Sequence, residues 1–410
     1  MNVRKLGTLA FAAALVVGAC QTGAPSGSGA GAKGTIEVWS SLPRQGSSKG
    51  QTDTIVNAIK LALEERGGVV AGYTIKYVDQ DDSTAEAGQW TEAKEIENAT
   101  NAVSNGNVVA YIGTFNSGAA KVSIPILCKA GIAMISPANT YPGLTKPGKG
   151  EADEPTKYYQ GCTRNYHRVV PADDLQGLAG AKWAAELEFT KVYVIDDSQL
   201  YGKGIADVFE AEAPGQGLEV VGRDGILGTE TDYKALAEKV GQADPDLVYF
   251  GGITQQNAGQ LWRDIKDTLP DVAMMGPDGI AETAFIEAAG DAAEGTYTTF
   301  GGLPADQLKG KGAQFVSAYT EKYGGELEAY TAYGYEAANV AFAAIERAAA
   351  TNPADTNALR AAVLKEISAT KDYEGVLGTW SFDANGDTSL VEMSGSIVTG
   401  GEFVFDKVIE

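Results

Sequence analysis

The sequence predicts an α/β protein with two doubly wound lobes, each a parallel sheet covered by helices on both faces. Short runs rich in Val, Ile and aromatic residues alternate with helical stretches of about 12–20 residues, which is typical of parallel strands joined by crossover helices. This alternation occurs in two series, one on each side of the region around Cys162. The chain of 410 residues is long enough for two or three globular domains.

The first series opens the folded part of the chain. Its first helix carries Ile55, Val56 and Ile59 on one stripe, and Gly67 ends it. Asp82 and the two hydroxyl residues after it offer a cap for the second helix. The strands are expected at residues 35–40, 73–79, 108–113 and 132–135. The helices are expected at residues 50–66, 82–105 and 117–130.

The second series has the same pattern and is followed by a helical region. Its strands are expected at residues 191–196, 218–222, 246–250 and 272–276. Its helices are expected at residues 171–188, 201–213, 231–241 and 255–269. Three more helices at 309–323, 328–350 and 356–370 precede a turn at 383–387 and two short strands.

Residues 1–20 resemble a bacterial lipoprotein signal peptide. Arg4 and Lys5 form a short basic region, and the apolar run after them is too short for a membrane-spanning helix, which needs about 20 residues. Small residues precede Cys20, as in the lipobox, whose cysteine is lipidated and becomes the new N-terminus. An ordinary signal peptide that contains a cysteine is the alternative. Residues 21–33 are rich in Gly, Ser, Ala and Pro, and we expect a flexible tether.

The charge of the chain excludes some classes of partner. It has 32 Lys and Arg against 54 Asp and Glu, which gives a formal net charge of -22. A nucleic-acid binder needs a basic surface to meet phosphate, so nucleic acid is not an expected partner. Electrostatic docking on anionic lipid is disfavoured for the same reason. A covalent lipid anchor remains compatible with this charge.

Cys128 and Cys162 are the cysteines left for the exported part of the chain. We expect a disulfide between them, because exported proteins fold in an oxidising compartment. A metal site is the poorer alternative, since the chain has one His and no Cys-x-x-Cys motif. The acidic residues Asp79, Asp81 and Asp82 are expected as a solvated loop and helix cap rather than as metal ligands.

The sequence gives no support for an enzyme or for a cofactor. His167 is the only histidine, and we expect it to be structural, at a crossing of the chain. No Gly-x-Ser-x-Gly nucleophile elbow is present. The glycine-rich segments 29–34 and 143–150 lack the strand and helix context that dinucleotide or phosphate binding requires.

Residues suited to ligand binding follow four of the predicted strands, where open parallel sheets bind ligands. Ser117 lies at a helix N-terminus, which favours anions. The turn after the next strand frees the backbones of Ala138 and Thr140, whereas Tyr201 and Asp278 follow strands of the second series. Each segment alone is more often an ordinary loop, but the four together indicate a site. A zwitterion with a carboxylate and an ammonium group would satisfy both lobes.

These segments carry a family resemblance. The resembling stretches are Ile112-Gly113-Thr114-Phe115-Asn116-Ser117, Ile135-Ser136-Pro137-Ala138-Asn139-Thr140, residues 196–204, Tyr249-Phe250-Gly251-Gly252, Met275-Gly276-Pro277-Asp278-Gly279 and Tyr297. They resemble the Leu/Ile/Val-binding proteins of ABC importers, which have the type I periplasmic-binding fold. The resemblance runs from about residue 35 to the C-terminus.

The resemblance implies a role for each matching residue. The Ser117 hydroxyl and the backbone N–H groups of Ala138 and Thr140 would hold the ligand carboxylate. Asp278, together with the Ala138 carbonyl and the Thr140 hydroxyl, would hold the ligand ammonium. Tyr201 would cover the ligand from the second lobe. Asp278 stands where many members have Glu, so its carboxylate reaches less far.

Other residues of the expected site set the ligand preference. Asn116 and Asn139 lie in the resembling segments, and Tyr330 is expected as a wall of the side-chain pocket. Ile253 occupies a position where the family often has an aromatic residue, and Arg44 in the first strand-to-helix loop would make the pocket more polar. The ligand is therefore expected to be a branched-chain or related amino acid, with an amide, a urea or a small organic acid as the alternative.

The resemblance also implies how the lobes are connected. Three crossings are expected near residues 164–168, 300 and 380, which assigns residues 34–165 plus 300–378 to the first lobe and 166–299 plus 379–410 to the second. The implied protein is a monomeric lipoprotein receptor on the outer face of a membrane, periplasmic or extracellular. It would close on its ligand, deliver it to a membrane permease and perform no chemistry. A sensory receptor is the alternative.

Overall fold

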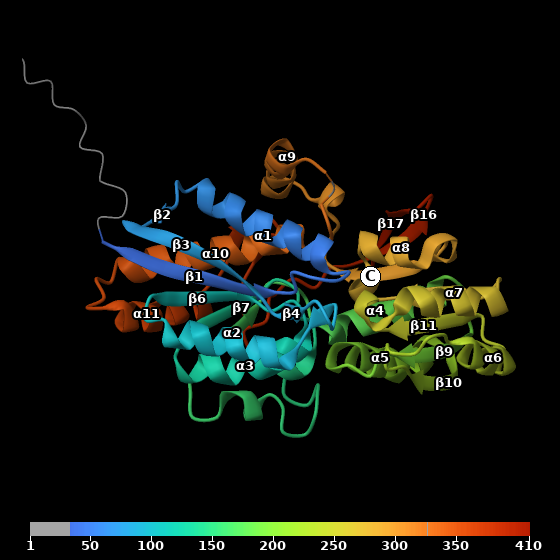
Figure 1. Cartoon of the computed structure of the whole chain (residues 1–410). Coiled ribbons are helices and arrows are strands. Elements are labelled where there is room, and N and C mark those ends of the chain that lie inside the picture. The colour runs from blue at the N-terminus through green and yellow to red at the C-terminus, as the bar shows by residue number, and fades with distance from the viewer. Residues whose placement is uncertain (1–32, 326) are drawn as a thin grey trace, which may run out of the picture.

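The computed structural model describes residues 33–325 and 327–410, which form two lobes side by side (Figure 1). The predicted signal peptide, Cys20 and residues 21–32 of the predicted tether lie outside the described residues. The two sheets, one in each lobe, confirm the predicted α/β fold class. Within the described part of the chain, no helix has both the length and the apolar character needed to cross a membrane.

The first lobe is built on a six-stranded sheet in which only β2 runs antiparallel to its neighbour. In spatial order its strands are β2 (Val69–Val70), β3 (Tyr73–Asp81), β1 (Thr35–Leu42), β6 (Val108–Gly113), β7 (Ala133–Ser136) and β8 (Tyr166–Arg168). Ile36 and Val38 of β1 pack on one face of this sheet, whereas Trp39 packs on the other. Because helices cover both faces, β1 is buried along its whole length after its first residue.

Two groups of helices provide this cover. The helices on the first face are α1 (Lys49–Glu64), α10 (Thr331–Ala349) and α11 (Thr356–Ser368). Those on the second face are α2 (Glu92–Ser104) and α3 (Ser117–Lys129). A further helix, α9 (Lys311–Tyr323), packs on the outside of α1 and α10, as Figure 1 shows.

The second lobe contains a seven-stranded sheet whose last two strands are antiparallel. In spatial order its strands are β10 (Glu219–Gly225), β9 (Lys191–Asp196), β11 (Leu247–Gly251), β12 (Ala273–Gly276), β13 (Tyr297–Gly301), β16 (Met393–Thr399) and β17 (Glu402–Ile409). One face carries α4 (Asp173–Glu186) and α5 (Leu200–Glu212). The other face carries α6 (Lys234–Ala243), α7 (Ala258–Thr268) and α8 (Thr283–Ala289).

The chain crosses between the lobes after β8, after β13 and before β16, which corrects the boundaries placed at residues 166, 300 and 379. Residues 166–168 form β8, which pairs in parallel with β7 and so belongs to the first lobe. β13 remains in the second sheet as far as Gly301. Trp380 and Phe382 pack in the first-lobe core, so the third crossing lies beyond them. Strand pairing and core packing decide these boundaries, and neither is visible in the sequence.

A buried ion pair holds the third crossing. Nε of Arg168 lies 2.7 Å from Oδ1 of Asp387, and both residues are buried. Nη1 of Arg168 donates to the backbone carbonyls of Asn139 and Tyr141, at 3.1 and 3.0 Å. One guanidinium therefore joins β8, the loop after β7 and the third crossing.

The segment after β3 differs from the prediction. A hairpin of β4 (Ser83–Thr84) and β5 (Gln89–Trp90) occupies the start of the predicted helix 82–105. The helix α2 begins only after Thr91, whose side chain caps it by accepting a hydrogen bond of 3.4 Å from the backbone N–H of Lys94. The residues before Thr91 are therefore free to pair as strands.

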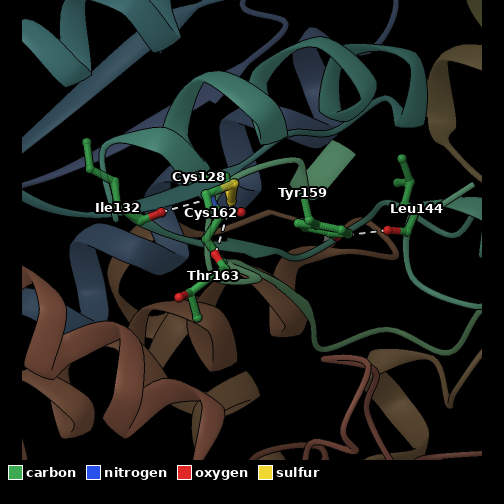
Figure 2. Close-up of a disulfide and its surroundings, with 7 residues drawn as sticks. Cys128, Ile132, Leu144, Tyr159, Cys162 and Thr163 are labelled. Carbon is green, nitrogen blue, oxygen red and sulfur yellow. Dashed lines mark hydrogen bonds between the residues drawn. A yellow bond between two sulfur atoms is a disulfide. The ribbon is translucent and has the colours of Figure 1, made fainter. Parts of the chain in front are cut away.

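The predicted disulfide between Cys128 and Cys162 is present, with the two Cα atoms 5.8 Å apart (Figure 2). It closes a loop whose ends are 34 positions apart. Inside this loop the Tyr159 hydroxyl donates to the Leu144 carbonyl at 2.8 Å, as Figure 2 shows. The buried carboxylate of Glu154 accepts hydrogen bonds from two tyrosine hydroxyls. The loop is thus packed by its own side chains.

We predict that the double substitution Cys128→Ser/Cys162→Ser lowers the free energy of unfolding by about 3–4 kcal/mol. In the chain-entropy treatment, a cross-link of this span restricts the unfolded chain by that amount. Urea unfolding followed by circular dichroism measures the change. Dithiothreitol should give the native chain the same loss and should not affect the double variant. Equal stability of the double variant and the oxidised native chain would contradict the prediction.

Candidate functional site

The loops that follow four parallel strands meet between the two lobes. The loops after β6 and β7 belong to the first lobe, and those after β9 and β12 belong to the second. All predicted ligand-binding residues except Arg44 are buried there: Asn116, Ser117, Ala138, Asn139, Thr140, Tyr201, Ile253, Asp278 and Tyr330.

Asp278 joins the two lobes. Its Oδ1 accepts a hydrogen bond of 2.8 Å from the hydroxyl of Tyr201, which belongs to the second lobe. Its Oδ2 accepts a hydrogen bond from the hydroxyl of Tyr330, which belongs to the first lobe. The residue is 4% exposed. This burial raises the pKa of Asp278, and the two hydroxyl donors oppose the shift.

Asp173, the first residue of α4, is a second buried carboxyl near Asp278. Neither of its oxygens meets hydrogen-bond geometry with a partner among the described residues. Burial raises the pKa of Asp173 and the charge of Asp278 raises it further, whereas the positive charge of Arg168 opposes the shift. A buried negative charge is unfavourable without a partner, so the two carboxyls favour a cation in this part of the site.

The first lobe offers groups that suit an anion. Ser117 begins α3, and its Oγ accepts a hydrogen bond of 3.3 Å from the backbone N–H of Tyr141. The first N–H groups of a helix lack partners within the helix and favour negative charge. The Thr140 hydroxyl is buried without a hydrogen-bond partner in the described part of the chain and can donate to an anion. Oδ1 of Asn116 is also buried without a partner there, but it can only accept a hydrogen bond.

The loop after β7 is held by internal hydrogen bonds. The backbone N–H groups of Ala138 and Asn139 donate to Oγ of Ser136, at 3.1 and 2.8 Å. The Asn139 side chain donates to the Phe115 carbonyl at 2.9 Å and also accepts a bond from a tyrosine hydroxyl. These side-chain bonds make Asn139 a support of the loop. The N–H of Thr140 is left without an acceptor among the described residues.

The second lobe contributes an apolar wall. Tyr201 and Ile253 pack with Ile205 in one buried cluster. The backbone N–H groups of Gln199 and Ile253 donate to the buried carboxylate of Asp197, at 2.9 and 3.1 Å, which fixes both loops. Burial raises the pKa of Asp197 to about 7. Ile253 therefore presents methyl groups on a well-supported loop.

Arg44 is engaged within the first lobe. Its guanidinium pairs with Asp53 at 2.5 Å and with Asp79 at 3.2 Å, and Nη1 donates to the Thr52 hydroxyl at 3.0 Å. Its backbone N–H donates to Asp81 at 3.0 Å. In the described chain, no hydrogen bond or ion pair of Arg44 reaches another predicted ligand-binding residue. Arg44 thus organises the loop after β1.

Polar side chains bridge the lobes around the site. Nε2 of Gln51 in α1 donates to Glu282 at 3.1 Å, and Oε1 of the same side chain accepts a bond of 3.3 Å from the N–H of Tyr330. Gln256 donates to Gln89 of the hairpin at 2.7 Å. The hairpin lies at the junction of the lobes in Figure 1. The lobes are therefore closed on each other, which accounts for the burial of the site.

A separate pair of buried carboxyls, Glu95 of α2 and Asp82, lies in the first lobe. Glu95 accepts hydrogen bonds from the hydroxyls of Ser41 and Tyr111, the latter at 3.1 Å. Burial raises the pKa of Glu95 to about 8 against these donors. Burial also raises the pKa of Asp82, and the charges of Glu95 and Asp81 add to the shift. Asp82 belongs to this pair and is not the predicted helix cap.

Sequence reasoning missed three residues of the site region. It interprets Asp173 only as part of a helix start. An acidic residue that comes soon after a buried strand and a crossing between lobes could have indicated a site residue. Gln51 lies within the first turn of an amphipathic helix and carries no signal of its own. Trp90 lies over the start of α3, where a Cβ on Gly118 would come within 2.5 Å of the indole. Only the unexpected hairpin brings Trp90 there.

Comparison with known proteins places the chain in a family. The profile of the family described as "Periplasmic binding protein" matches residues 35–394. The chain belongs to the periplasmic binding protein family. The match covers both lobes and ends near the start of β16, before most of the last two strands of the second sheet. Members are substrate-binding proteins and not enzymes, in line with the expectation from the sequence.

Curated relatives of this periplasmic binding protein are similar along most of their length. It is 29% identical to Leu/Ile/Val-binding protein homolog 2 of Brucella abortus over 358 residues, which is 87% of this chain and 88% of the relative. It is 27% identical to the Leu/Ile/Val-binding protein BraC3 of Rhizobium johnstonii over 356 residues, 86% of this chain and 88% of the relative.

Solved structures have the same two-lobed fold. The leucine-binding protein LivK of Thermotoga maritima gives a TM-score of 0.79 at 26% identity, covering 92% of this chain and 99% of that one. LivJ of Streptococcus pneumoniae in complex with isoleucine gives 0.75 at 24% identity, covering 91% and 100%. A solute-binding protein of R. palustris in complex with benzoate gives 0.76 at 19% identity, covering 92% and 96%. The last two comparisons concern the fold alone.

We predict that Glu95→Gln stabilises the chain more at pH 8 than at pH 5. Because the folded state raises the pKa of Glu95 to about 8, it keeps a proton that the unfolded chain releases above about 4.3, so stability falls as the pH rises between these values. Gln imitates the protonated form, so the gain at pH 8 should be on the order of 2–4 kcal/mol.

Chemical unfolding at both pH values measures this difference. Glu92→Gln is the matched control, because Glu92 is exposed on the same helix and should show no such pH dependence. A Glu95→Gln variant that is less stable than the native chain at both pH values would contradict the prediction.

Proposed function

We propose that this periplasmic binding protein is the receptor of an ABC importer and binds an amino acid with an apolar side chain between its lobes. The observation that carries the proposal is the position of Asp278. Its buried carboxylate lies between tyrosine hydroxyls from opposite lobes, with a second buried carboxyl, Asp173, nearby. Such a site calls for a cation that is enclosed when the lobes close.

The ligand ammonium belongs on the acidic side of the cleft. Among the described residues, neither Asp278 nor Asp173 forms an ion pair with a basic side chain, and Arg168 is paired with Asp387. An ammonium supplies three donors and a positive charge. Each charge-assisted hydrogen bond in such a setting contributes about 1.5–3 kcal/mol. The Thr140 hydroxyl, which is buried without a partner among the described residues, is a further acceptor.

The ligand carboxylate belongs on the first-lobe side. Ser117 at the start of α3 and the N–H of Thr140 supply donors there, and the helix N-terminus favours the negative charge. The N–H of Ala138 donates to Oγ of Ser136 at 3.1 Å. It is therefore less available to the ligand carboxylate than the resemblance implied. The two ends of a zwitterion thus find opposite charges across the cleft.

The side chain of the ligand meets apolar surfaces. Ile253 and Tyr201 form one wall, and the edge-to-face pair of Phe115 and Tyr330, with ring centroids 5.8 Å apart, forms the other. The relatives named as Leu/Ile/Val-binding proteins support an aliphatic amino acid. The benzoate complex shows that the same fold also holds an organic acid in another protein. An anion alone would leave Asp278 and Asp173 without a counter-charge, which disfavours that class here.

Delivery follows from closure. A receptor that encloses its ligand presents a different surface when filled, and a membrane permease can distinguish the two states. We propose that Cys20 carries a lipid that holds the receptor at the outer face of the membrane, and that the receptor acts as a monomer. A sensory partner in place of a permease uses the same binding site.

We predict that Asp278→Asn weakens binding of the amino acid at least tenfold, which corresponds to about 1.4 kcal/mol, while the fold survives. A thermal-shift panel of amino acids, amides, urea and short organic acids first identifies the best ligand, because a ligand at 100 times its Kd adds about 2.7 kcal/mol. Titration calorimetry with that ligand then compares native and variant chains.

Asp271→Asn is the matched control for this experiment. Asp271 is exposed just before β12, and its substitution should leave the affinity unchanged. Unchanged affinity of Asp278→Asn for an amino acid would refute the ammonium site. A best ligand that lacks an ammonium group would refute the amino-acid class.

We predict that Cys20→Ala releases the protein from the membrane. The native chain, expressed in a bacterium that processes lipoproteins, should sediment with membranes and incorporate labelled fatty acid, and the variant should do neither. Ser28→Ala in the tether serves as the control and should behave like the native chain. Absence of label from the native chain would refute the lipid anchor.

A further inference from the structure

One face of the second sheet lacks a covering helix close to the crossings. The ring of Tyr297 and the position of Gly395 contact Trp183 of α4 on the opposite face. Because side chains alternate along a strand, the neighbouring residues Thr298 and Ser394 point away from α4. They line a cavity of about 640 Å³ over β13, β16 and β17, beside α8. Figure 1 shows β16 and β17 at this edge of the lobe.

The walls of this cavity, which we call the hinge cavity, come from both lobes. Ile286 of α8 contributes from the second lobe, Val316 of α9 contributes from the first, and Pro304 lies in the second crossing between them. The volume falls within the range of about 300–1,000 Å³ that is typical of small-molecule sites. It is separate from the ligand cleft, because neither Asp278 nor Tyr201 lines it.

The floor of the hinge cavity combines aromatic rings with the hydroxyl residues Thr298, Ser394 and Ser396. Phe403 and Phe405 of β17 and Phe300 of β13 present aromatic rings to it. Ser394 is only 1% exposed, and its hydroxyl has no hydrogen-bond partner among the described residues. A buried hydroxyl without a partner is costly, so its position on the cavity wall indicates a bound group that accepts or donates a hydrogen bond.

The charged side chains on the rim of the hinge cavity are acidic. Glu287, Asp306 and Glu402 stand on its exposed rim. None of the three takes part in an ion pair within the described residues, although Asp306 accepts a bond from Gln307 at 2.8 Å. Among the described residues, no Lys, Arg or His lines the cavity. An anion is therefore disfavoured and a cation is favoured at its mouth.

We propose that the hinge cavity is a second binding site, which takes an organic cation with an apolar body, such as an arylalkylammonium. The apolar body lies on the phenyl rings of β17, where aromatic faces also attract a cation. The charged end lies toward the rim carboxylates, and a polar atom of the ligand satisfies the Ser394 hydroxyl. The site does not depend on the identity of the amino acid in the cleft.

Titration calorimetry with phenylbutylamine, and with phenylbutyrate as the anion of matched apolar body, tests the proposal. The chain used is the Asp278→Asn variant, which lacks the carboxylate that the proposed function assigns to the ligand ammonium. Amine that still binds in the cleft through Asp173 is recognised because it survives in the variants that fill the hinge cavity. We expect the amine to bind at least tenfold more tightly than the anion. Ser396→Phe and Ala305→Trp each fill the cavity and should abolish the heat of binding, with folding checked by circular dichroism.

Charge variants test the rim directly. Glu287→Gln/Glu402→Gln should remove most of the preference for the amine, whereas Asp406→Asn, an exposed neighbour on β17 outside the cavity, should not. Absence of amine binding, equal affinity for the anion, or binding retained in both filled variants would overturn the proposal.

Sedimentation velocity tests whether a second copy of the chain, rather than a small molecule, occupies the hinge cavity. Self-association of the chain that both filled variants abolish, in the absence of amine binding, would make this face a subunit contact and would also overturn the proposal. The proposed function is tested independently, because it predicts loss of amino-acid binding in Asp278→Asn and makes no claim about phenylbutylamine.

Discussion

The buried guanidinium of Arg168 fixes the geometry on which the rest of the molecule depends. It pairs with Asp387 at the third crossing and holds the carbonyls of Asn139 and Tyr141 in the loop after β7. Removing one partner of a buried ion pair lowers the free energy of unfolding by about 3–5 kcal/mol, so the fold depends strongly on this contact. The Thr140 backbone lies between the two anchored carbonyls. The loop after β7 is therefore positioned by the same guanidinium that holds the third crossing.

The cleft complements this rigid frame with unbalanced charge. Asp278 and Asp173 are buried with tyrosine hydroxyls and helix termini around them, and the guanidinium of Arg168 is paired with Asp387 instead. Closing the lobes over these carboxyls without a cation is unfavourable, and closing them over an ammonium is favourable. A ligand that brings the cation thus shifts the population toward the closed state by its differential affinity. In the proposed function, charge burial connects recognition of the ligand with closure of the lobes.

The residues that the sequence predicts well are those fixed by local pattern. Strands buried on both faces appear as continuous apolar runs, and Tyr201 and Asp278 follow such runs, so their convergence could be inferred. Asp173, Gln51 and Trp90 reach the site through tertiary packing, which leaves no periodic signal. Tertiary packing also explains Arg44. Its charge in a loop after a strand suggests a ligand contact, but in the fold its guanidinium pairs with Asp53 and Asp79 of the same lobe.

The hinge cavity and the cleft meet at one pair of aromatic rings. Phe300 lines the hinge cavity, and its ring centroid lies 5.1 Å from that of Tyr330, whose hydroxyl donates to Asp278 in the cleft. Topology makes this contact unavoidable: β13 is the last strand before the second crossing, and Tyr330 caps the helix α10 that packs against the first sheet. The hydroxyl of Tyr330, from the first lobe, meets Asp278, from the second lobe, in this closed arrangement of the lobes. If both proposed sites bind their ligands, this ring contact is the direct route by which one site would influence the other.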